Sequence, residues 1–252
     1  LLAAGADPNE AATSRPTADW GTPLLWAIRR RRSPAHVQAL LAAGADPAAR
    51  TPDGTDARTL ALRFGLPEVA ALLPPGAGAA PLPADERFVT ACAAGDEAAA
   101  RDIQAGRPDL PGGLDPARLR LLPELAADGV AAAVRTMVRL GWPIATRGGD
   151  WEASALNHAV FRGDAALVRF LLEHGADWRE RHGFDDDASG TLAWASLNRP
   201  LAGGDWLGCA RALLAHGMPR GERDPGGSDD VLLDGRRKRF SDEVAELLVG
   251  GR

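Results

Sequence analysis

The sequence predicts an all-α fold, a solenoid of about seven full or degenerate helix-turn-helix units with irregular loops between them. One phrase recurs almost unchanged, as LLAAGADP at residues 1–8 and 40–47 and as LLEHGADW at 171–178. Apolar pairs continue the same register along the chain, at intervals of 31 to 42 residues. Because a unit this short cannot bury its apolar face alone, recurring units are expected to stack on one another.

Each unit is expected to contain two short helices and a loop. The first helix is clearest in TPLLWA at 22–27, SALNHAVFRGD at 154–164 and GTLAWAS at 190–196. The second helix carries the apolar positions, which are Leu1/Leu2, Leu40/Leu41, Leu72/Leu73, Ile103, Met137/Val138, Leu171/Leu172, Leu213/Leu214 and Leu247/Leu248. These residues are expected to pack between neighbouring units, together with the small Ala27, Ala91, Ala159 and Ala195.

Residue types at the expected helix ends fit this division. Thr22 and Ser154 can cap a first helix through the hydroxyl, and Pro23 suits a first turn, where no N–H is needed. Asp46 and Asp177 suit the turn after a second helix, because an Asp side chain can accept a backbone N–H two residues on. Left-handed glycines are expected between the paired helices at Gly65, Gly95, Gly129, Gly163 and Gly204, and after the second helix at Gly44, Gly141, Gly175 and Gly217.

The motifs TPLLWA, SALNHAVFRGDAALVRFLLEHGAD and GADP resemble the ankyrin repeat, with its TPLHxAA opening and its unit of roughly 33 residues. The resemblance covers most of the chain and is strongest over residues 21–47 and 154–177. It implies a stack of paired helices whose connecting loops project as fingers. It also implies that the fingers and the adjoining first-helix surface bind a partner protein.

The domain organisation is predicted as one solenoid over residues 1–252. Its units are a partial first repeat at 1–20, repeats with their loops at 21–50, 51–84, 85–116, 117–148, 149–186 and 187–228, and a C-terminal capping repeat at 229–252. Segments rich in Pro and Gly at 74–83, 106–116 and 221–230 are expected to be enlarged loops, because they cannot continue a helix. A linker between two domains is the competing interpretation of 74–83. Because the chain opens inside a repeat without Met, it is expected to be part of a longer protein.

Composition excludes several functional classes. The net charge of −5 and the pI near 5.6 argue against general affinity for nucleic acid. No run of 18 apolar residues exists, so no membrane span is expected. Cys92 and Cys209 are expected to be buried thiols, which suits a cytoplasmic location. Lys238 is the single lysine among 29 basic residues, and this arginine bias suggests a GC-rich, bacterial genome.

Seven tryptophans stand out in a chain with only 5% aromatic residues. Trp26 and Trp194 occupy the same first-helix position and are expected in the core. Trp20, Trp142, Trp151 and Trp178 fall in or beside loops, where they either contact a partner or cover a neighbouring loop. Phe161, at an outward first-helix position, would join them in one stripe. Trp206 stands beside the insertion LNRPLAGGDW and fits either role.

Arginines offer a second candidate surface, predicted as a basic ridge at the ends of the first helices. RRRR at 29–32 and RRKR at 236–239 occupy equivalent positions in this register, and Arg63, Arg162 and Arg199 fall near the same place. Such a ridge would bind an acidic partner or a phosphate group. The alternative is that these are ordinary solvated cations, which the dipole favours at helix C-termini. The partner-binding residues predicted from both surfaces are Trp20, Arg29, Arg30, Trp142, Asp150, Trp151, Phe161, Arg162 and Trp178.

Catalysis and metal binding have little support in the sequence. His174 and His216 occupy the LLxHG position, where a histidine ends a helix. HGFDDD at 182–187 is predicted to be a solvated acidic loop, because adjacent carboxylates cannot all converge on one ion. GxSxG, GxxxxGK[ST] and CxxC pairs are absent from the sequence. We therefore expect no enzyme activity, no cofactor and no metal.

The predicted function is a non-catalytic protein–protein interaction module that presents loop tips and the inner helix face to a partner protein. The chain is expected to be a monomer on its own. An alternative function is that of a regulatory or structural solenoid segment in a larger protein whose catalytic part lies elsewhere. The sequence leaves open whether the module is an inhibitor or immunity protein, an adaptor or a secreted effector.

Overall fold

The computed structural model describes residues 4–11, 13, 21–75 and 81–250. The chain forms two compact units, Leu1–Leu110 and Pro111–Arg252. The boundary lies inside the second Pro/Gly-rich segment, 106–116, and not at 74–83. The helix-turn-helix fold class predicted from the repeats is confirmed within each unit. The single solenoid predicted over residues 1–252 stays a prediction. Trp20, which belongs to its predicted first repeat, lies outside the described residues.

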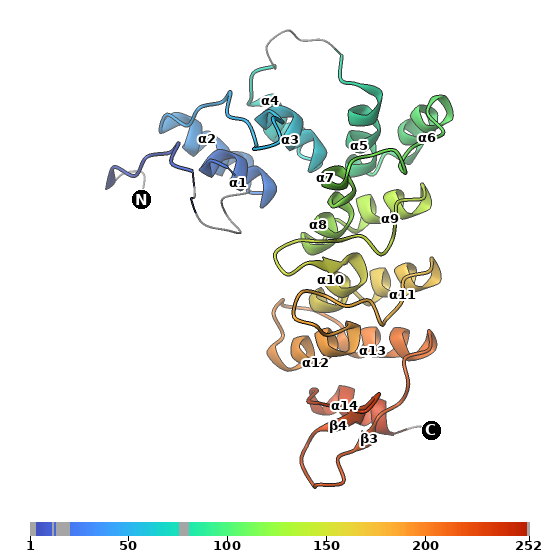
Figure 1. Ribbon diagram of the computed structural model, residues 1–252. Coiled ribbons are helices and arrows are strands. Elements are labelled where there is room, and N and C mark those ends of the chain that lie inside the picture. Colours follow the sequence, from blue (N-terminus) through green and yellow to red (C-terminus); the bar gives the residue numbers. More distant parts are fainter. Residues whose placement is uncertain (1–3, 12, 14–20, 76–80, 251–252) are drawn as a thin grey trace. The chain divides into compact units, whose positions relative to one another are not determined.

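The first unit consists of paired helices. Its helices are α1 (Pro23–Arg29), α2 (Pro34–Ala42), α3 (Ala57–Arg63), α4 (Pro67–Ala71), α5 (Ala84–Ala94) and α6 (Glu97–Gly106). Each odd-numbered helix packs against the even-numbered helix that follows it, and α3 packs against both α1 and α5 (Figure 1). The first helices of successive repeats therefore form one layer, as the register of the apolar pairs predicts.

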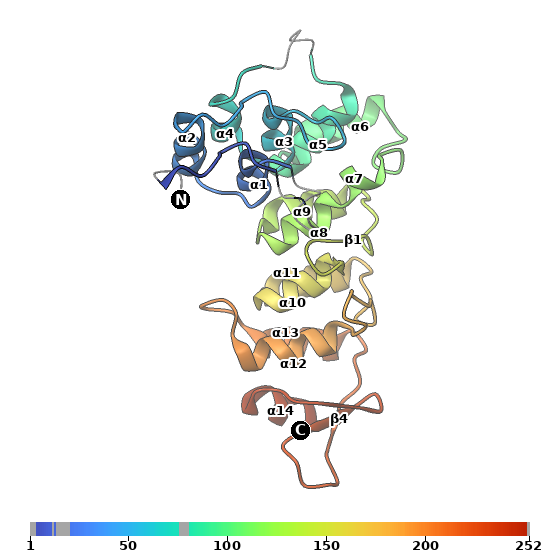
Figure 2. The ribbon, with the colours of Figure 1, turned by 60° about the vertical axis from the view of Figure 1, so that its left-hand side comes forward.

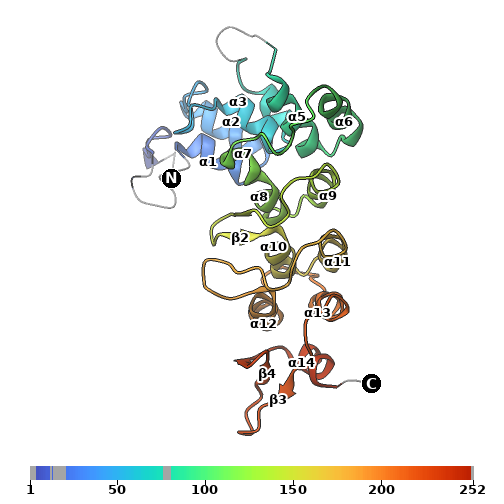
Figure 3. The same cartoon turned by 45° about the vertical axis from the view of Figure 1, so that its right-hand side comes forward.

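The second unit repeats this arrangement and ends differently. It comprises α7 (Pro116–Leu119), α8 (Leu121–Ala127), α9 (Ala131–Arg139), β1 (Arg147–Gly148), β2 (Ala153–Ser154), α10 (Ala155–Arg162), α11 (Ala165–Glu173), α12 (Ala188–Asn198), α13 (Trp206–Ala215), β3 (Glu222–Arg223), β4 (Val231–Leu233), β5 (Arg236–Lys238) and α14 (Asp242–Val249). The inner layer is α8, α10 and α12, and the outer layer is α9, α11 and α13 (Figures 2 and 3). β1 and β2 form a short antiparallel pair before α10.

Local sequence explains where the helices end. Ser154 accepts the backbone N–H of Asn157, and Asp46 and Asp177 each accept the N–H two residues on. Eight of the nine predicted glycines have positive φ, between 64° and 96°. Gly204 does not, because α12 ends one turn earlier, at Arg199 with φ 45°. The predicted side-chain cap at Thr22 is wrong: the residue precedes α1 in extended conformation, but its hydroxyl accepts no capping N–H.

Most of the described apolar positions form the core, as predicted, but Ile103 and the small Ala91 are only half-buried, and Leu1 and Leu2 lie outside the described residues. Met137, Val138, Leu171, Leu172, Leu213 and Leu248 are buried, and the small Ala27, Ala159 and Ala195 are buried beside them. Burial is weakest in the second predicted repeat, where Leu40 and Leu41 are both half-buried. Cys92 and Cys209 are buried free thiols. No described helix combines the length and apolar character needed to cross a bilayer.

The C-terminal segment contains a β-meander that the sequence analysis did not predict. β3, β4 and β5 form an antiparallel sheet, and α14 packs against α13. RRKR at 236–239 was placed at a helix end, and this is wrong because Arg236–Lys238 is a strand. The two-residue turn of Asp234 and Gly235, both with positive φ, joins β4 to β5. Such Asp-Gly turns match the twist of paired strands, so they favour a hairpin over a helix.

Candidate functional site

The second unit carries a surface of large apolar side chains, which we call the aromatic surface: Trp151, Phe161, Phe184, Trp194 and Leu197. Phe184, Trp194 and Leu197 are 78%, 51% and 47% exposed, and they are the large hydrophobic residues most open to solvent in the described part of the chain. Trp151 and Phe161 are half-buried. Since monomeric proteins rarely leave neighbouring large apolar groups in water, this surface is the candidate site.

Ring contacts join Trp151, Phe161 and Trp194 directly, and Phe184 contacts His182, which in turn contacts Trp151. Phe161, near the end of α10, stacks on Trp194 of α12 with ring centroids 5.5 Å apart and planes 11° apart. Trp151, from the turn between β1 and β2, lies against Phe161 with centroids 5.8 Å apart. Leu197 lies on the same side of α12 as Trp194, three residues on. The inner helices of two successive repeats and one loop therefore contribute to the same surface.

Two buried histidines pack against Trp151. The rings of His158 and His182 meet Trp151 edge-on, with centroids 4.8 and 4.9 Å away. His158 Nε2 donates to the carbonyl of Gly148 at 3.1 Å, which places the proton on Nε2. The backbone N–H of Gly183 donates to the carbonyl of Trp151 at 2.9 Å. The tryptophan is thus held in place by its neighbours, which reduces the entropy it loses on binding a partner.

Burial makes this support sensitive to acid. Burial lowers the pKa of His158 from 6.5 to about 4, and burial also lowers the pKa of His182. The unfolded chain takes up its proton at the ordinary pKa, so stability is full above pH 6.5 and falls as the pH drops towards 4. We expect His158 to account for about 2 kcal/mol of lost stability between neutral pH and about pH 5. Urea unfolding at both pH values should show this loss, and His158→Gln should reduce it; an unchanged pH dependence in that variant would contradict the assignment.

The predicted stripe of loop tryptophans is wrong for two of its members. Trp142 and Trp178 are 3% and 2% exposed, so they cover neighbouring residues and offer no contact surface. The Arg179 guanidinium lies 4.5 Å from the Trp178 ring centroid. Trp20 lies outside the described residues. Of the predicted stripe, Trp151 and Phe161 remain at the surface, with the exposed Asp150 beside them.

The core prediction for Trp26 and Trp194 also needs correction. Trp194 is half-exposed and central to the aromatic surface, and Trp26 is only half-buried. Two guanidiniums lie over the Trp26 ring, those of Arg30 at 5.9 Å and Arg32 at 5.4 Å from the centroid. Trp206 belongs to the core, and its Nε1 donates to the carbonyl of Phe161 at 3.4 Å.

The predicted arginine ridge is a set of structural contacts between repeats. Arg162 donates to the carbonyl of Ala127 at 2.9 Å, and Arg31 donates to the carbonyl of Phe64. Both acceptors lie at the end of a first helix in a neighbouring repeat. Arg199 pairs with Glu243 at 2.9 Å. Because these guanidiniums satisfy carbonyls and carboxylates of the chain itself, they are poor candidates for a shared ligand surface. Arg29 and Arg30, the two partner-binding residues predicted at the end of α1, are both half-buried.

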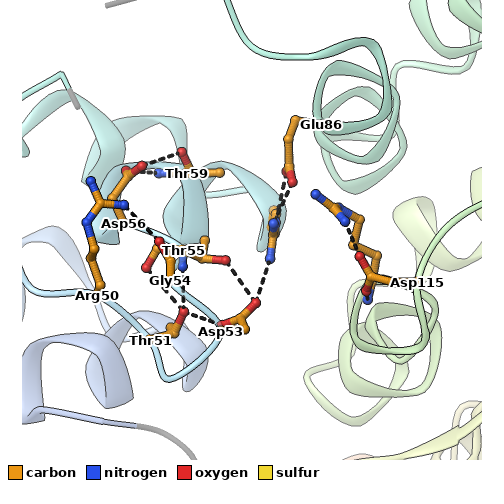
Figure 4. A network of polar contacts seen from close by, with 11 residues as sticks. Arg50, Thr51, Asp53, Gly54, Thr55, Asp56, Thr59, Glu86 and Asp115 are labelled. Atoms are coloured by element: carbon orange, nitrogen blue, oxygen red, sulfur yellow. Dashed lines mark hydrogen bonds and ion pairs between the residues drawn. The ribbon is translucent and has the colours of Figure 1, made fainter. Parts of the chain in front are cut away.

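Arg63 is the most deeply engaged of these arginines, and Figure 4 shows two of its partners, Glu86 and Asp53. Its Nε and Nη2 donate to the two carboxylate oxygens of Glu86 at 2.8 and 2.5 Å, with both side chains at most 10% exposed. Asp53 lies 3.8 Å away and accepts the hydroxyls of Thr51 and Thr55. The network ties the loop before α3 to α3 and α5. Arg63 therefore acts in the packing of the first unit.

The loop at 182–187 was predicted to be a solvated acidic loop, and this is wrong for His182, which is buried, and for Asp186 and Asp187, which the chain itself binds. Asp187 caps α12 by accepting two backbone N–H groups. Asp186 accepts the ammonium of the buried Lys238 at 2.5 Å. Burial opposes ionisation of Asp186, but the hydrogen bonds from Lys238 and the Asp187 backbone together with the positive charges of Lys238 and Arg236 outweigh it, and the pKa lies below its ordinary value. No cluster of three or more metal-ligating side chains occurs among the described residues, and His174 and His216 bond to carbonyls four residues back.

The chain is similar to several solved structures at low sequence identity. No family model matches the chain, and no curated protein matches it. Similar solved structures include the ankyrin repeat domain of Bcl-3, a member of the IkappaB protein family, at 22% identity and TM-score 0.39, covering 85% of this chain and 76% of that one. The human ASB11 ankyrin repeat domain is 18% identical with TM-score 0.40, covering 86% and 90%. An ankyrin repeat domain from Acinetobacter baumannii AYE is 17% identical with TM-score 0.40, covering 77% and 81%.

These neighbours are ankyrin repeat domains, the family that the repeat motifs resemble. The assignment of helix-turn-helix repeats rests on the paired helices, the left-handed glycines and the buried apolar pairs described above.

Proposed function

We propose that this chain is a non-catalytic protein–protein interaction module whose aromatic surface binds an apolar segment of a partner protein. The observation that carries the proposal is the exposure of Trp194, which stacks on Phe161, together with the exposure of Leu197 and Phe184. Tryptophan is enriched among the residues that dominate binding energy, because it buries a large area at a low entropic cost. Stacked repeats hold that surface rigid before a partner arrives.

We also propose where this module acts and what kind of organism it comes from. We propose a cytoplasmic module from a bacterium, monomeric on its own. Two buried free thiols and the arginine-rich composition support this setting. Ankyrin repeat domains generally bind proteins, which supports a protein as the ligand.

The proposal can be tested with a random peptide library displayed on phage and selected against the whole chain. Enriched peptides should be rich in aromatic and aliphatic residues. Their affinity should fall at least about tenfold for Trp194→Ala, because truncating a central tryptophan costs on the order of 2 kcal/mol. Trp194→Phe keeps an aromatic ring against Phe161 and should lose much less.

Leu207→Ala provides the matched control, since this half-buried leucine belongs to α13 and not to the aromatic surface. Circular dichroism should show that all three variants stay folded. If selected peptides bind Trp194→Ala and the parent chain equally well, the aromatic surface is not the binding site. The same conclusion follows if Leu207→Ala weakens binding as much as Trp194→Ala does.

A further inference from the structure

The outer helices of the second unit carry an arginine at one equivalent position each. Arg135, Arg169 and Arg211 lie on α9, α11 and α13, and each stands two residues before the apolar pair of its repeat. α9 packs against α11 and α11 packs against α13, so the three positions follow one another across this layer (Figure 3). Packed helices have axes about 8–10 Å apart, which sets the approximate spacing of the arginines. We call these residues the arginine ladder.

The residues one turn before and one turn after the ladder arginines decide the charge of this face. One turn before each arginine the residue is small: Ala132, Ala166 and Gly208. One turn after, the exposed residues are Arg139, Glu173 and Ala215, so a single carboxylate lies among them. The outer face of these three helices is therefore basic, although the chain as a whole has a net charge of −5.

The ladder differs from the first-helix arginines in its contacts. Arg169 and Arg211 are exposed and make no hydrogen bond or ion pair with any described residue. Arg135 donates to the carbonyl of Ala166 at 3.0 Å and lies 4.6 Å from the Phe170 ring centroid, which places it next to α11. Arg162 and Arg63, by contrast, are engaged within the fold. Arg169 and Arg211 thus offer guanidinium donors that the described part of the chain does not use, and Arg135 stands beside them with one donor already engaged.

We infer that the arginine ladder is a second binding surface, which takes an acidic segment of a protein. A guanidinium binds a carboxylate through two parallel hydrogen bonds, so carboxylates spaced along a peptide suit separate arginines. Nucleic acid and anionic membranes are attracted by a broad positive potential, which a chain of net charge −5 lacks. The surface lies on the outer helices and is independent of the aromatic surface on the inner ones.

The test uses a fluorescein-labelled oligoglutamate peptide as the probe and fluorescence anisotropy as the readout. The whole chain should bind the probe at low salt, and binding should weaken as salt rises. Arg169→Ala combined with Arg211→Ala should weaken binding about five- to tenfold, since two charge-assisted contacts are lost. Replacing both arginines with lysine keeps the charge but loses the paired hydrogen bonds, so it should restore only part of the affinity.

The matched control combines Arg87→Ala with Arg223→Ala, two exposed arginines outside the ladder that change the net charge by the same amount. This control should bind as the parent chain does. An equal loss in both double variants would reduce the effect to net charge and overturn the inference, as would failure of the parent chain to bind oligoglutamate. Tighter binding of a single-stranded RNA or of phosphatidylserine vesicles through the same arginines would also overturn it. Failure of this test leaves the aromatic surface unaffected, because none of its residues is changed.

Discussion

Glu86→Ala is expected to destabilise the first unit by about 3–5 kcal/mol. The substitution removes the carboxylate that accepts both donors of Arg63, and it leaves a guanidinium buried without its main counter-charge. A charge in that position pays the cost of desolvation without the compensating attraction. Urea unfolding of the whole chain, followed by circular dichroism, measures the loss. Hydrogen exchange in α3 and α5 would locate it.

Glu97→Ala is the control for this prediction. Glu97 pairs with Arg101 one turn away on α6, where the two side chains are 29% and 56% exposed, against at most 10% for Arg63 and Glu86. Exposed pairs of this kind contribute only about 0.3–0.5 kcal/mol. Equal losses in the two variants would show that the Arg63–Glu86 pair contributes no more than a surface pair. Replacing both Arg63 and Glu86 with leucine should cost less than Glu86→Ala alone, because no unpaired charge remains.

Gly163→Ala is expected to cost about 2–5 kcal/mol. Gly163 ends α10 with φ +68°, which costs an L-residue about 1–2 kcal/mol. A Cβ there would lie 2.6 Å from the Cα of Gly204 and 2.8 Å from the backbone nitrogen of Asp205, and overpacking of this kind adds about 1–3 kcal/mol. It would also push against the hydrogen bond from Asp205 N–H to the carbonyl of Gly163.

Gly175→Ala separates the two contributions. Gly175 also has positive φ, at +96°, but an added Cβ would meet nothing within 4 Å. This variant should therefore show only the conformational cost of about 1–2 kcal/mol. Thermal unfolding of both variants gives the comparison. If both lose the same stability, the close approach between the α10–α11 turn and the α12–α13 loop does not constrain the backbone.

Features fixed by local chemistry could be predicted from the sequence. The left-handed glycines, the Ser154 cap and the Asp46 and Asp177 turns each depend on a few neighbouring residues, and the structure confirms them. The prediction of a left-handed glycine at Gly204 was wrong, because the preceding insertion lets a non-glycine residue, Arg199, end the helix. The Asp234-Gly235 turn was a local hairpin signal that the sequence analysis missed, because counting back from the last leucine pair suggested a helix there.

Exposure of the tryptophans could not be predicted in the same way. His158 of α10 and Trp194 of α12 stand at the same first-helix position, one residue before Ala159 and Ala195. Trp151 covers His158, whereas Trp194 stays half-exposed against Phe161. The difference is made by a loop folding over one repeat, and register along the helices does not encode where a loop lies. For the same reason, the sequence did not predict that Trp142 and Trp178 are buried.

The arginines show a related distinction. Their position at helix ends correctly suggested a favourable role for positive charge, but the partners lie in neighbouring repeats and depend on stacking. The arginine ladder could have been predicted from the sequence. Four of the second helices have an arginine two residues before the apolar position, namely Arg101 of the first unit and the three ladder arginines of the second, and comparing equivalent positions instead of searching for clusters would have found them.

The ion pair between Lys238 and Asp186 couples the order of the loop that carries Phe184 to the order of the C-terminal hairpin. The loop that presents Phe184 is fastened by this pair to the C-terminal hairpin, with Arg236 3.6 Å from the same carboxylate. A ligand that prefers the ordered loop must therefore also favour the ordered hairpin, and by thermodynamic reciprocity the hairpin must favour the ligand. Clipping the chain near residue 234 would then weaken recognition at Phe184 without removing a single contacting atom.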